Sequence, residues 1–176
     1  MTTCLIPGLD FEVDSRIDPN EFRSVLGNFA TGLTIVTAMT DDGPVGFTCQ
    51  SFSSLSLDPP LVLLCVSNTS STWPRIRADG RFCINVLAAH QHQLSTKFAR
   101  SRSDKFSGVD FRLSPNGSPT LPGAAAWIEC QLEAEHEGGD HTIVVGAVLN
   151  LGANEGADPL LFHRGRYSKA GGKVLG

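Results

Sequence analysis

The sequence predicts a mainly β domain with short helices, whose strands form an antiparallel barrel that we expect to be closed. Short apolar or alternating stretches follow one another at close spacing, and few stretches show helical periodicity. Such a pattern does not fit a doubly wound parallel sheet, in which strands alternate with longer helices. The 176 residues are 41% hydrophobic and 18% charged, a globular composition sufficient for one domain with its own core.

A capping signal marks the first helix. Asp18 can accept hydrogen bonds from the first amides, Pro19 suits the first helical position, and Glu21 completes a capping box. Apolar residues then follow at helical spacing, and Gly32 is expected to end the helix; they are Phe22, Val25, Leu26, Phe29 and Ala30. We expect residues 1–17 to be a flexible tail, 18–170 to form the domain, and 171–176 to be a flexible end.

The next segments predict an antiparallel hairpin and a buried strand. Residues 33–39 and 45–49 are apolar stretches separated by the turn sequence Asp41-Asp42-Gly43. A Ser-rich segment ending at Pro59-Pro60 is expected to be a loop. The continuous apolar run of residues 61–66 predicts a buried strand.

The remaining chain predicts two short helices and more strands. The helices are expected over 70–78, capped by Ser70 or Ser71, and over 90–100. Residues 101–123 are rich in Ser, Pro, Gly and charge, which predicts a long functional loop or lid. Strands are expected over 82–87, 127–135 and 142–151 and from residue 160, with a turn at 137–140.

Charge and cysteine content exclude several protein classes. A formal net charge of -4 gives no global support for binding nucleic acid or anionic membranes. The five cysteines are odd in number and show no C-x-x-C spacing, so neither a disulfide framework nor a metal site is expected. Residues 1–17 do not resemble a signal peptide, and no apolar run is long enough to span a membrane. We therefore expect a cytoplasmic protein.

Standard catalytic signatures are missing from the sequence. Residues 27–34 space their glycines like a phosphate-binding loop, but Leu33 stands where the lysine belongs. No dinucleotide-binding G-x-G-x-x-G, no G-x-S-x-G and no H-E-x-x-H occurs. Residues 46–60 place several hydroxyls among apolar residues, a composition that could line a planar aromatic ligand. By composition alone, serines that cap their own backbone are the favoured explanation of this segment.

A resemblance favours the ligand-binding interpretation. Six segments occur in the order found in the flavin reductase-like family, and together they cover residues 17–167. They are Phe22-Arg23 with the run from Gly32 to Thr37, Gly46 to Val62, Arg81 to Leu87, Asp104-Lys105-Phe106, Gly139-Asp140-His141, and Leu161 to Tyr167. The chain most resembles the small reductase components of two-component flavin-dependent monooxygenases.

This resemblance implies a fold and an activity. Family members form a flavin-binding split β-barrel with Greek-key order and work as homodimers. They reduce free flavin with a nicotinamide cofactor, which implies FAD, or FMN, and NADH, or NADPH, as cofactors, with FAD favoured. The reduced flavin would pass to a separate monooxygenase. Hydride transfer between the two cofactors needs no nucleophile or metal from the protein, which is consistent with the missing signatures.

The resemblance also implies site residues. His141 would lie beside the nicotinamide and is the candidate catalytic residue. Candidates for the flavin ring and ribityl chain are Thr31, Thr34, Cys49, Gln50, Ser51, Phe52, Ser54 and Leu57. Candidates for the flavin phosphates or tail are Ser70, Trp73, Arg100 and Lys105, and candidates for the nicotinamide nucleotide are Tyr167 and Arg164.

Two other functions remain open on the same type of barrel. A non-catalytic flavin carrier would bind flavin tightly and oxidise NADH poorly. An oxidase of the pyridoxamine-phosphate type uses a related barrel, although the Gly139-Asp140-His141 and Ser51 to Ser56 segments fit that family poorly. Fold alone cannot separate these functions.

Overall fold

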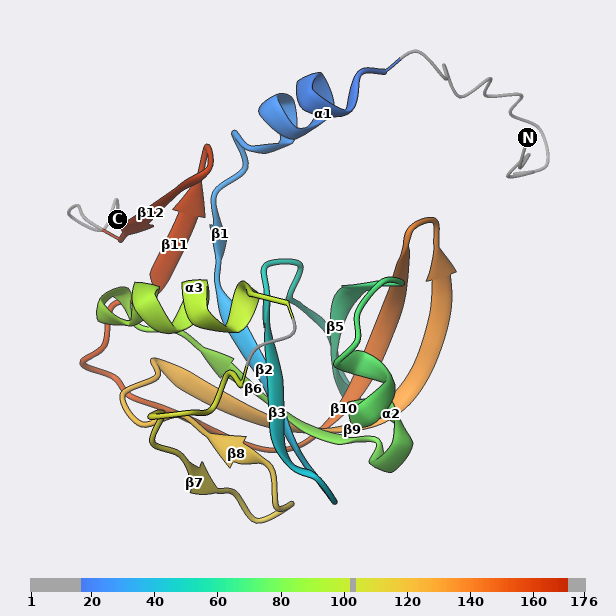
Figure 1. The fold of residues 1–176 in the computed structure, drawn as a ribbon, viewed down its shortest axis with the longest axis vertical. Coiled ribbons are helices and arrows are strands. Elements are labelled where there is room, and N and C mark those ends of the chain that lie inside the picture. The colour runs from blue at the N-terminus through green and yellow to red at the C-terminus, as the bar shows by residue number, and fades with distance from the viewer. Residues whose placement is uncertain (1–16, 102–103, 171–176) are drawn as a thin grey trace.

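The computed structural model describes residues 17–101 and 104–170. The predicted flexible ends, 1–16 and 171–176, lie outside these residues, so the domain limits at 18 and 170 stay predictions. The described part is mainly β with three short α-helices (Figure 1). No helix in it is long and apolar enough to cross a membrane.

The strands form one large sheet and two small ones. The seven-stranded sheet has the order β3-β2-β6-β9-β10-β5-β4, a second sheet has the order β1-β11-β12, and β7 pairs with β8. All these pairings are antiparallel. The bounds are β1 Thr31–Gly32, β2 Thr34–Thr40, β3 Gly43–Cys49, β4 Ser53–Leu57, β5 Pro60–Ser67, β6 Arg81–Val86, β7 Arg112–Leu113, β8 Pro119–Thr120, β9 Ala126–Gly138, β10 His141–Ala153, β11 Leu160–His163 and β12 Arg166–Lys169.

The mainly β prediction is confirmed, but the expectation of a closed barrel is wrong. The large sheet keeps two edges, β3 and β4, and no strand ladder joins β3 to β5. The gap arises because the chain leaves β3 at Cys49 and turns directly to the other edge, where β4 pairs with β5. Residues 53–57, expected to be loop, therefore form a strand.

The first helix is confirmed but is shorter than expected. Asp18 accepts hydrogen bonds from the amides of Asn20 and Glu21, as a capping residue should, and α1 spans Pro19–Leu26. It ends at Gly27 because β1 begins at Thr31, where the backbone pairs with β11. Helix α1 projects from the body (Figure 1), and its apolar side chains, among them Phe22 and Val25, stay exposed.

The other two helices lie near the predicted positions. Helix α2 covers Trp73–Asp79, and α3 covers His92–Ala99 after a short 3-10 turn, Ala89–Gln91. Helix α3 lies close against β3 because Gly46 has no side chain: a Cβ there would lie 3.0 Å from the ring of Phe98.

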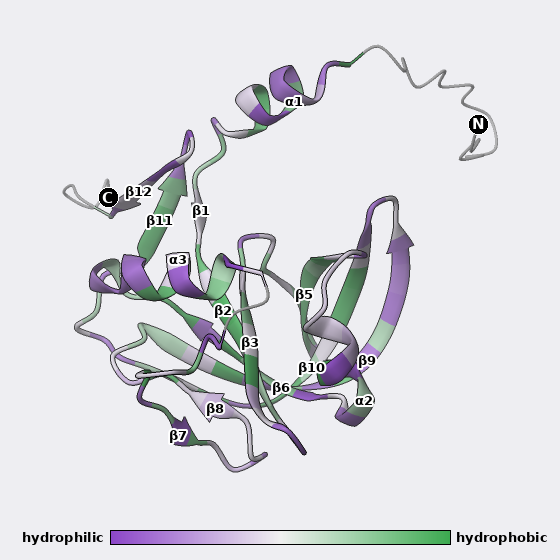
Figure 2. Cartoon of the chain, viewed as in Figure 1, coloured by the Kyte–Doolittle hydropathy of each residue, from purple (hydrophilic) through white to green (hydrophobic). Residues whose placement is uncertain are grey.

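Two apolar clusters hold the fold together. One fills the interior of the large sheet around Val36, Leu64 and Phe82. The other lies under α3 and contains Ile35, from the opposite face of β2. Figure 2 shows β2 as largely hydrophobic, which agrees with burial of both its faces, whereas the outer end of β9 is hydrophilic.

The segment predicted as a lid is largely packed against the body. Phe106 and Leu121 belong to the cluster under α3. The buried Asn85 accepts a hydrogen bond from the Leu121 amide at 2.8 Å and donates one to the Pro119 carbonyl at 3.4 Å. The described part of residues 101–123 is thus attached through apolar and polar contacts, and only its beginning reaches the cavity described below.

Candidate active site

A cavity of about 860 Å³ opens between the two edges of the large sheet. Its lining comes from the end of β3, the link to β4, the loop after β5, the end of α3 and the start of β10. Small-molecule sites in proteins fall in this range of volumes. The segments come from distant parts of the sequence, so only the fold assembles them.

Ser51 closes one end of this cavity. Its hydroxyl donates to the Cys65 carbonyl at 2.9 Å and accepts from the Cys65 amide at 3.0 Å. These two bonds continue the β4–β5 pairing one step beyond Ser53 and Leu63. Nearby, Thr34 donates to the Cys49 carbonyl at 2.8 Å and holds the end of β3 to β2.

The loop after β5 supplies a hydroxyl-rich wall. The hydroxyls of Ser67 and Thr69 lie 2.8 Å apart, and Ser67 also accepts from the Thr69 amide at 3.3 Å. Ser70 accepts from the amides of Thr72 and Trp73, at 3.3 and 3.2 Å, and so supports the start of α2 as the sequence predicts. Ser67, Thr69 and Ser70 all line the cavity.

Two cationic side chains border the cavity. Arg100 follows the last turn of α3, and Lys105 donates to the Gly46 carbonyl at 3.0 Å. Partial burial lowers the pKa of Lys105 from its ordinary value, because desolvation disfavours the charged form. An anionic group bound beside Lys105 would pair with its ammonium group and stabilise the charged form.

His141 begins β10 and lines the cavity beside the hydroxyl-rich wall. Its Nδ1 lies 2.7 Å from Asp140 Oδ1, and the hydrogen bond and charge of His141 lower the pKa of the Asp140 carboxyl. Because an ionised carboxylate can only accept, Nδ1 carries the proton in this pair. The pair leaves Nε2 available to a ligand, and the side chain is 43% exposed.

The hydroxyl of Thr31 has no hydrogen-bond partner. It is the one buried side-chain polar atom in this condition among residues 17–101 and 104–170, and Thr31 lines the cavity. Buried polar atoms in proteins are almost always paired. A polar ligand in the cavity would satisfy this atom. The same residues bring together no cluster of His, Cys, Asp or Glu that could hold a metal ion.

Comparison with known proteins identifies the family. The flavin reductase like domain matches residues 26–171. The chain belongs to this family. It is 49% identical over 158 residues to the reductase subunit HsaB of a flavin-dependent monooxygenase from Mycobacterium tuberculosis, covering 89% of this chain and 84% of that protein. The predicted resemblance is therefore confirmed, and the chain is a flavin reductase.

Solved structures agree with this assignment. Nitrilotriacetate monooxygenase component B from Mycobacterium thermoresistibile superposes with a TM-score of 0.85 at 47% identity, over 88% of each chain. The NADH:FAD oxidoreductase SgcE6 of Streptomyces globisporus, solved with NAD and FAD fragments, superposes with a TM-score of 0.84 at 37% identity. That match covers 89% of this chain and 95% of SgcE6.

The fold of the reductase brings together most of the predicted site residues. Those that line the cavity are Thr31, Cys49, Gln50, Ser51, Phe52, Ser70, Arg100, Lys105 and His141. Their binding roles stay predictions. Cys49 does not present a reactive thiolate there, because burial raises the pKa of its thiol.

Three other predicted residues support the cavity from behind or lie away from it. Thr34 is buried behind the end of β3. Trp73 is only 5% exposed, donates from Nε1 to Glu135 at 2.8 Å, and packs edge-on against Phe47 of the cavity lining. Leu57, at the far end of β4, is 96% exposed and outside the cavity lining.

The last three predicted residues also lie outside the cavity lining. Ser54 lies within β4, opposite Val62. Arg164 donates from its guanidinium to Asn28 Oδ1 at 2.9 and 2.6 Å and so joins the β11–β12 turn to the end of α1. Tyr167 packs against Phe162 and shares hydrogen bonds with the α3 residues Ser95 and Thr96.

Several residues that line the cavity were not predicted from the sequence. Ser67 and Thr69 directly follow a predicted buried strand, and this position was the available signal for them. Phe29 was assigned to a helical face, yet it lines the cavity beyond the end of α1.

Proposed function

We propose that this reductase uses NAD(P)H to reduce free flavin, with FAD favoured over FMN, and supplies the product to a separate monooxygenase. The observation that carries the proposal is the cavity itself. It combines the unpaired Thr31 hydroxyl, a hydroxyl-rich wall, two cations and the exposed Nε2 face of His141. A planar polar ring with a phosphorylated tail fits this mixture of groups.

The flavin is proposed to lie along the segment from Cys49 to Phe52. The backbone there is held in place by Thr34 and Ser51, so it offers fixed polar groups to a ring and ribityl chain. Thr31 would pair with the same ligand. Ser70, Arg100 and Lys105 are proposed to bind its phosphates, because phosphate recognition needs donors and positive charge.

His141 is proposed to orient the nicotinamide. In the neutral imidazole, Asp140 keeps the proton on Nδ1, so Nε2 can accept a hydrogen bond from a carboxamide. When both nucleotides are bound, they supply the hydride transfer from nicotinamide to flavin. The protein residues bind and align the two rings, and the apolar part of the lining, including Phe47 and Phe52, excludes water.

The names of related proteins support the choice of partners. One relative, 45% identical over 148 residues, is the FMN reductase (NADH) SmoA of Agrobacterium fabrum, whereas SgcE6 is an NADH:FAD oxidoreductase. NADH is therefore the proposed donor, and both flavins are candidates, with FAD first. The monooxygenase partner is proposed from the HsaB relative. We further propose a homodimer with Greek-key strand order, located in the cytoplasm.

An anaerobic mixing experiment tests this function. Protein, NADH and either FAD or FMN are combined, and bleaching of the visible flavin absorbance is followed. The proposal expects rapid bleaching that scales with protein concentration, faster with FAD than with FMN and faster with NADH than with NADPH. Tight flavin binding without catalysed bleaching would contradict the proposal and support the carrier alternative.

A further inference from the structure

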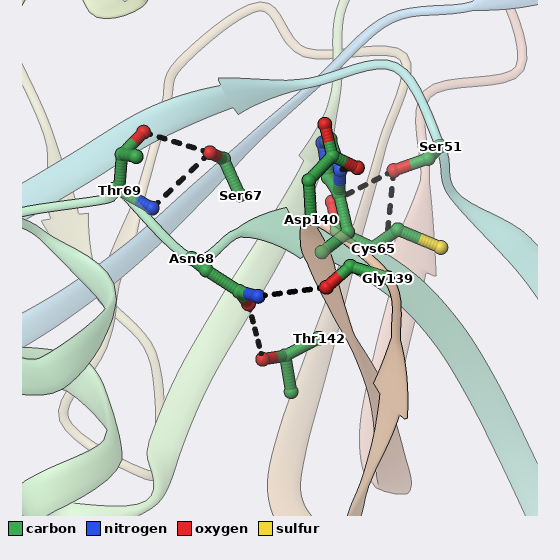
Figure 3. Close-up of polar contacts among 9 residues, drawn as sticks. Ser51, Cys65, Ser67, Asn68, Thr69, Gly139, Asp140 and Thr142 are labelled. Carbon is green, nitrogen blue, oxygen red and sulfur yellow. Dashed lines mark hydrogen bonds and ion pairs between the residues drawn. The ribbon is translucent and has the colours of Figure 1, made fainter. Parts of the chain in front are cut away.

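Asn68 joins the loop after β5 to the turn that carries His141. Its side-chain nitrogen donates to the Gly139 carbonyl at 3.1 Å, and its side-chain oxygen accepts from the Thr142 hydroxyl at 2.9 Å (Figure 3). Its backbone amide donates to the Asp140 carbonyl at 3.0 Å. Both polar ends of the side chain and the backbone amide therefore bind the same turn.

The residues that Asn68 contacts lie on both sides of His141 in the sequence. Gly139 and Asp140 precede it, Thr142 follows it, and Asn68 binds all three. Gly139 has a φ of 74°, a left-handed conformation that forms the two-residue turn between β9 and β10. His141 is thus the first residue of β10 to pair after the turn, and Asn68 forms hydrogen bonds to that turn.

Apolar packing does not hold this turn. Gly139, Asp140 and Asn68 are all exposed. The turn lies at the outer end of the sheet (Figure 1), just beyond His141, which pairs with Gly138 of β9 and Ser67 of β5. Exposed turns with few buried contacts open easily unless hydrogen bonds oppose the motion. The hydrogen bonds from Asn68 are such a restraint.

Asn68 also links two parts of the cavity lining without belonging to it. Its chain neighbours Ser67 and Thr69 line the cavity with their hydroxyls, and His141 lines it from β10. Asn68 itself is absent from the lining. The side chain therefore connects the residues on either side of His141 to the loop that carries the hydroxyl-rich wall, while Asn68 itself lies outside the lining.

We propose that Asn68 is a positioning residue that aligns His141 for the nicotinamide. This inference rests on the proposed function of His141. Removal of the Asn68 side-chain carboxamide loosens the β9–β10 turn, so the His141 imidazole spends less time in the productive orientation. The flavin-binding segment from Cys49 to Phe52 is held by other contacts and keeps its place.

The test compares Asn68→Ala with a matched control, Asn150→Ala. Asn150 is an exposed asparagine further along β10, and within the described part of the chain its side chain accepts a hydrogen bond only from the adjacent Leu151 amide. We expect kcat/KM for NADH to fall about tenfold in Asn68→Ala, because misalignment of a positioned group slows reaction. The dissociation constant of flavin, measured by fluorescence quenching, should stay within about twofold. The control should match the wild type in both values.

Two further readouts separate alignment from general loss of structure. Exchange of the residue 68 backbone amide, which bonds to Asp140, should quicken about tenfold in Asn68→Ala, with or without ligands. Thr142→Val should lower kcat/KM for NADH by part of the amount seen in Asn68→Ala. Thr142→Ser keeps the hydroxyl and should retain the wild-type kcat/KM. Equal weakening of flavin binding and NADH kinetics would overturn the positioning role.

A double variant connects the effect to His141. In the His141→Ala background, Asn68→Ala should cause no further loss of kcat/KM, because both changes remove the same alignment. Fully additive losses, or a silent His141→Ala, would overturn the inference while leaving the reductase function intact. An inactive wild-type protein would instead show that the proposed function itself had failed.

Discussion

The Ser51 hydroxyl forms two hydrogen bonds with the backbone of Cys65, one to its carbonyl and one from its amide. Ser51 lies two residues before the start of β4 and continues its register, in which Ser53 pairs with Leu63 of β5. The Ser51 side chain thus forms hydrogen bonds to β5 at the position where the backbone pairing of β4 with β5 ends. The large sheet stays open between its edges β3 and β4, and both Ser51 and Cys65 line the cavity.

Ser51→Ala removes both bonds and leaves the Cys65 backbone without these partners. We expect the free energy of unfolding to fall by about 1–2 kcal/mol, because each lost neutral hydrogen bond contributes about 1 kcal/mol. Urea denaturation measures the change. Ser54→Ala, an exposed serine within β4, is the control and should unfold like the wild type. Identical midpoints for all three proteins would contradict the structural role of Ser51.

His141→Ala should slow NADH oxidation at saturating flavin by tenfold or more, on the order expected for loss of an orienting group. Flavin affinity should change little, because the residues proposed to bind flavin are held by other contacts. Steady-state kinetics and fluorescence titration give the two values. His136→Ala removes an exposed histidine of β9 and should leave both unchanged. Equal rates in His141→Ala and wild type would remove His141 from the mechanism.

Lys105→Gln should weaken flavin binding by about tenfold, as expected for loss of one charge-assisted hydrogen bond. The pH dependence follows from the same residue. Desolvation places the pKa of Lys105 below its ordinary 10.5, so the cation is lost as pH rises toward that value. Flavin affinity should therefore fall in alkaline solution in the wild type and less steeply in Lys105→Gln. Lys169→Gln, on β12, is the control and should behave as wild type.

Two buried thiols predict loss of stability at high pH. Burial raises the pKa of both Cys83 and Cys130 from 9.0 to about 12. Above pH 9 the unfolded chain releases these protons while the folded chain keeps them, so stability falls between pH 9 and 12. The slope is up to about 1.4 kcal/mol per pH unit for each thiol. Denaturation of the Cys83→Ala/Cys130→Ala double variant should show a clearly shallower decline, and an unchanged slope would refute this origin.

Local signals predicted the local structure well. The Asp18 capping box gave the start of α1, and the Asp41-Asp42-Gly43 turn gave the β2–β3 hairpin, because both depend on residues close in sequence. β4 was missed because its serines are weak strand formers, and its pairing depends on β5. The open barrel was missed for a similar reason: strand spacing predicts pairing but not whether the last edges meet.

The site could be predicted only as a set of motifs. The family resemblance brought His141, Lys105 and the segment around Ser51 into one hypothesis, and the fold brings them to one cavity. It could not separate Trp73, an aromatic residue of the core, from an aromatic residue of the site. Nor could it reveal Asn68, whose partner Gly139 is 71 positions away.

The central claim is that this chain catalyses reduction of free flavin by NADH. Loss of NADH absorbance, followed with purified protein before and after addition of FAD, tests it most directly. We expect little oxidation of NADH without flavin and strong stimulation with it, and a smaller stimulation in His141→Ala. No stimulation by FAD or FMN, despite flavin binding shown by fluorescence quenching, would contradict it.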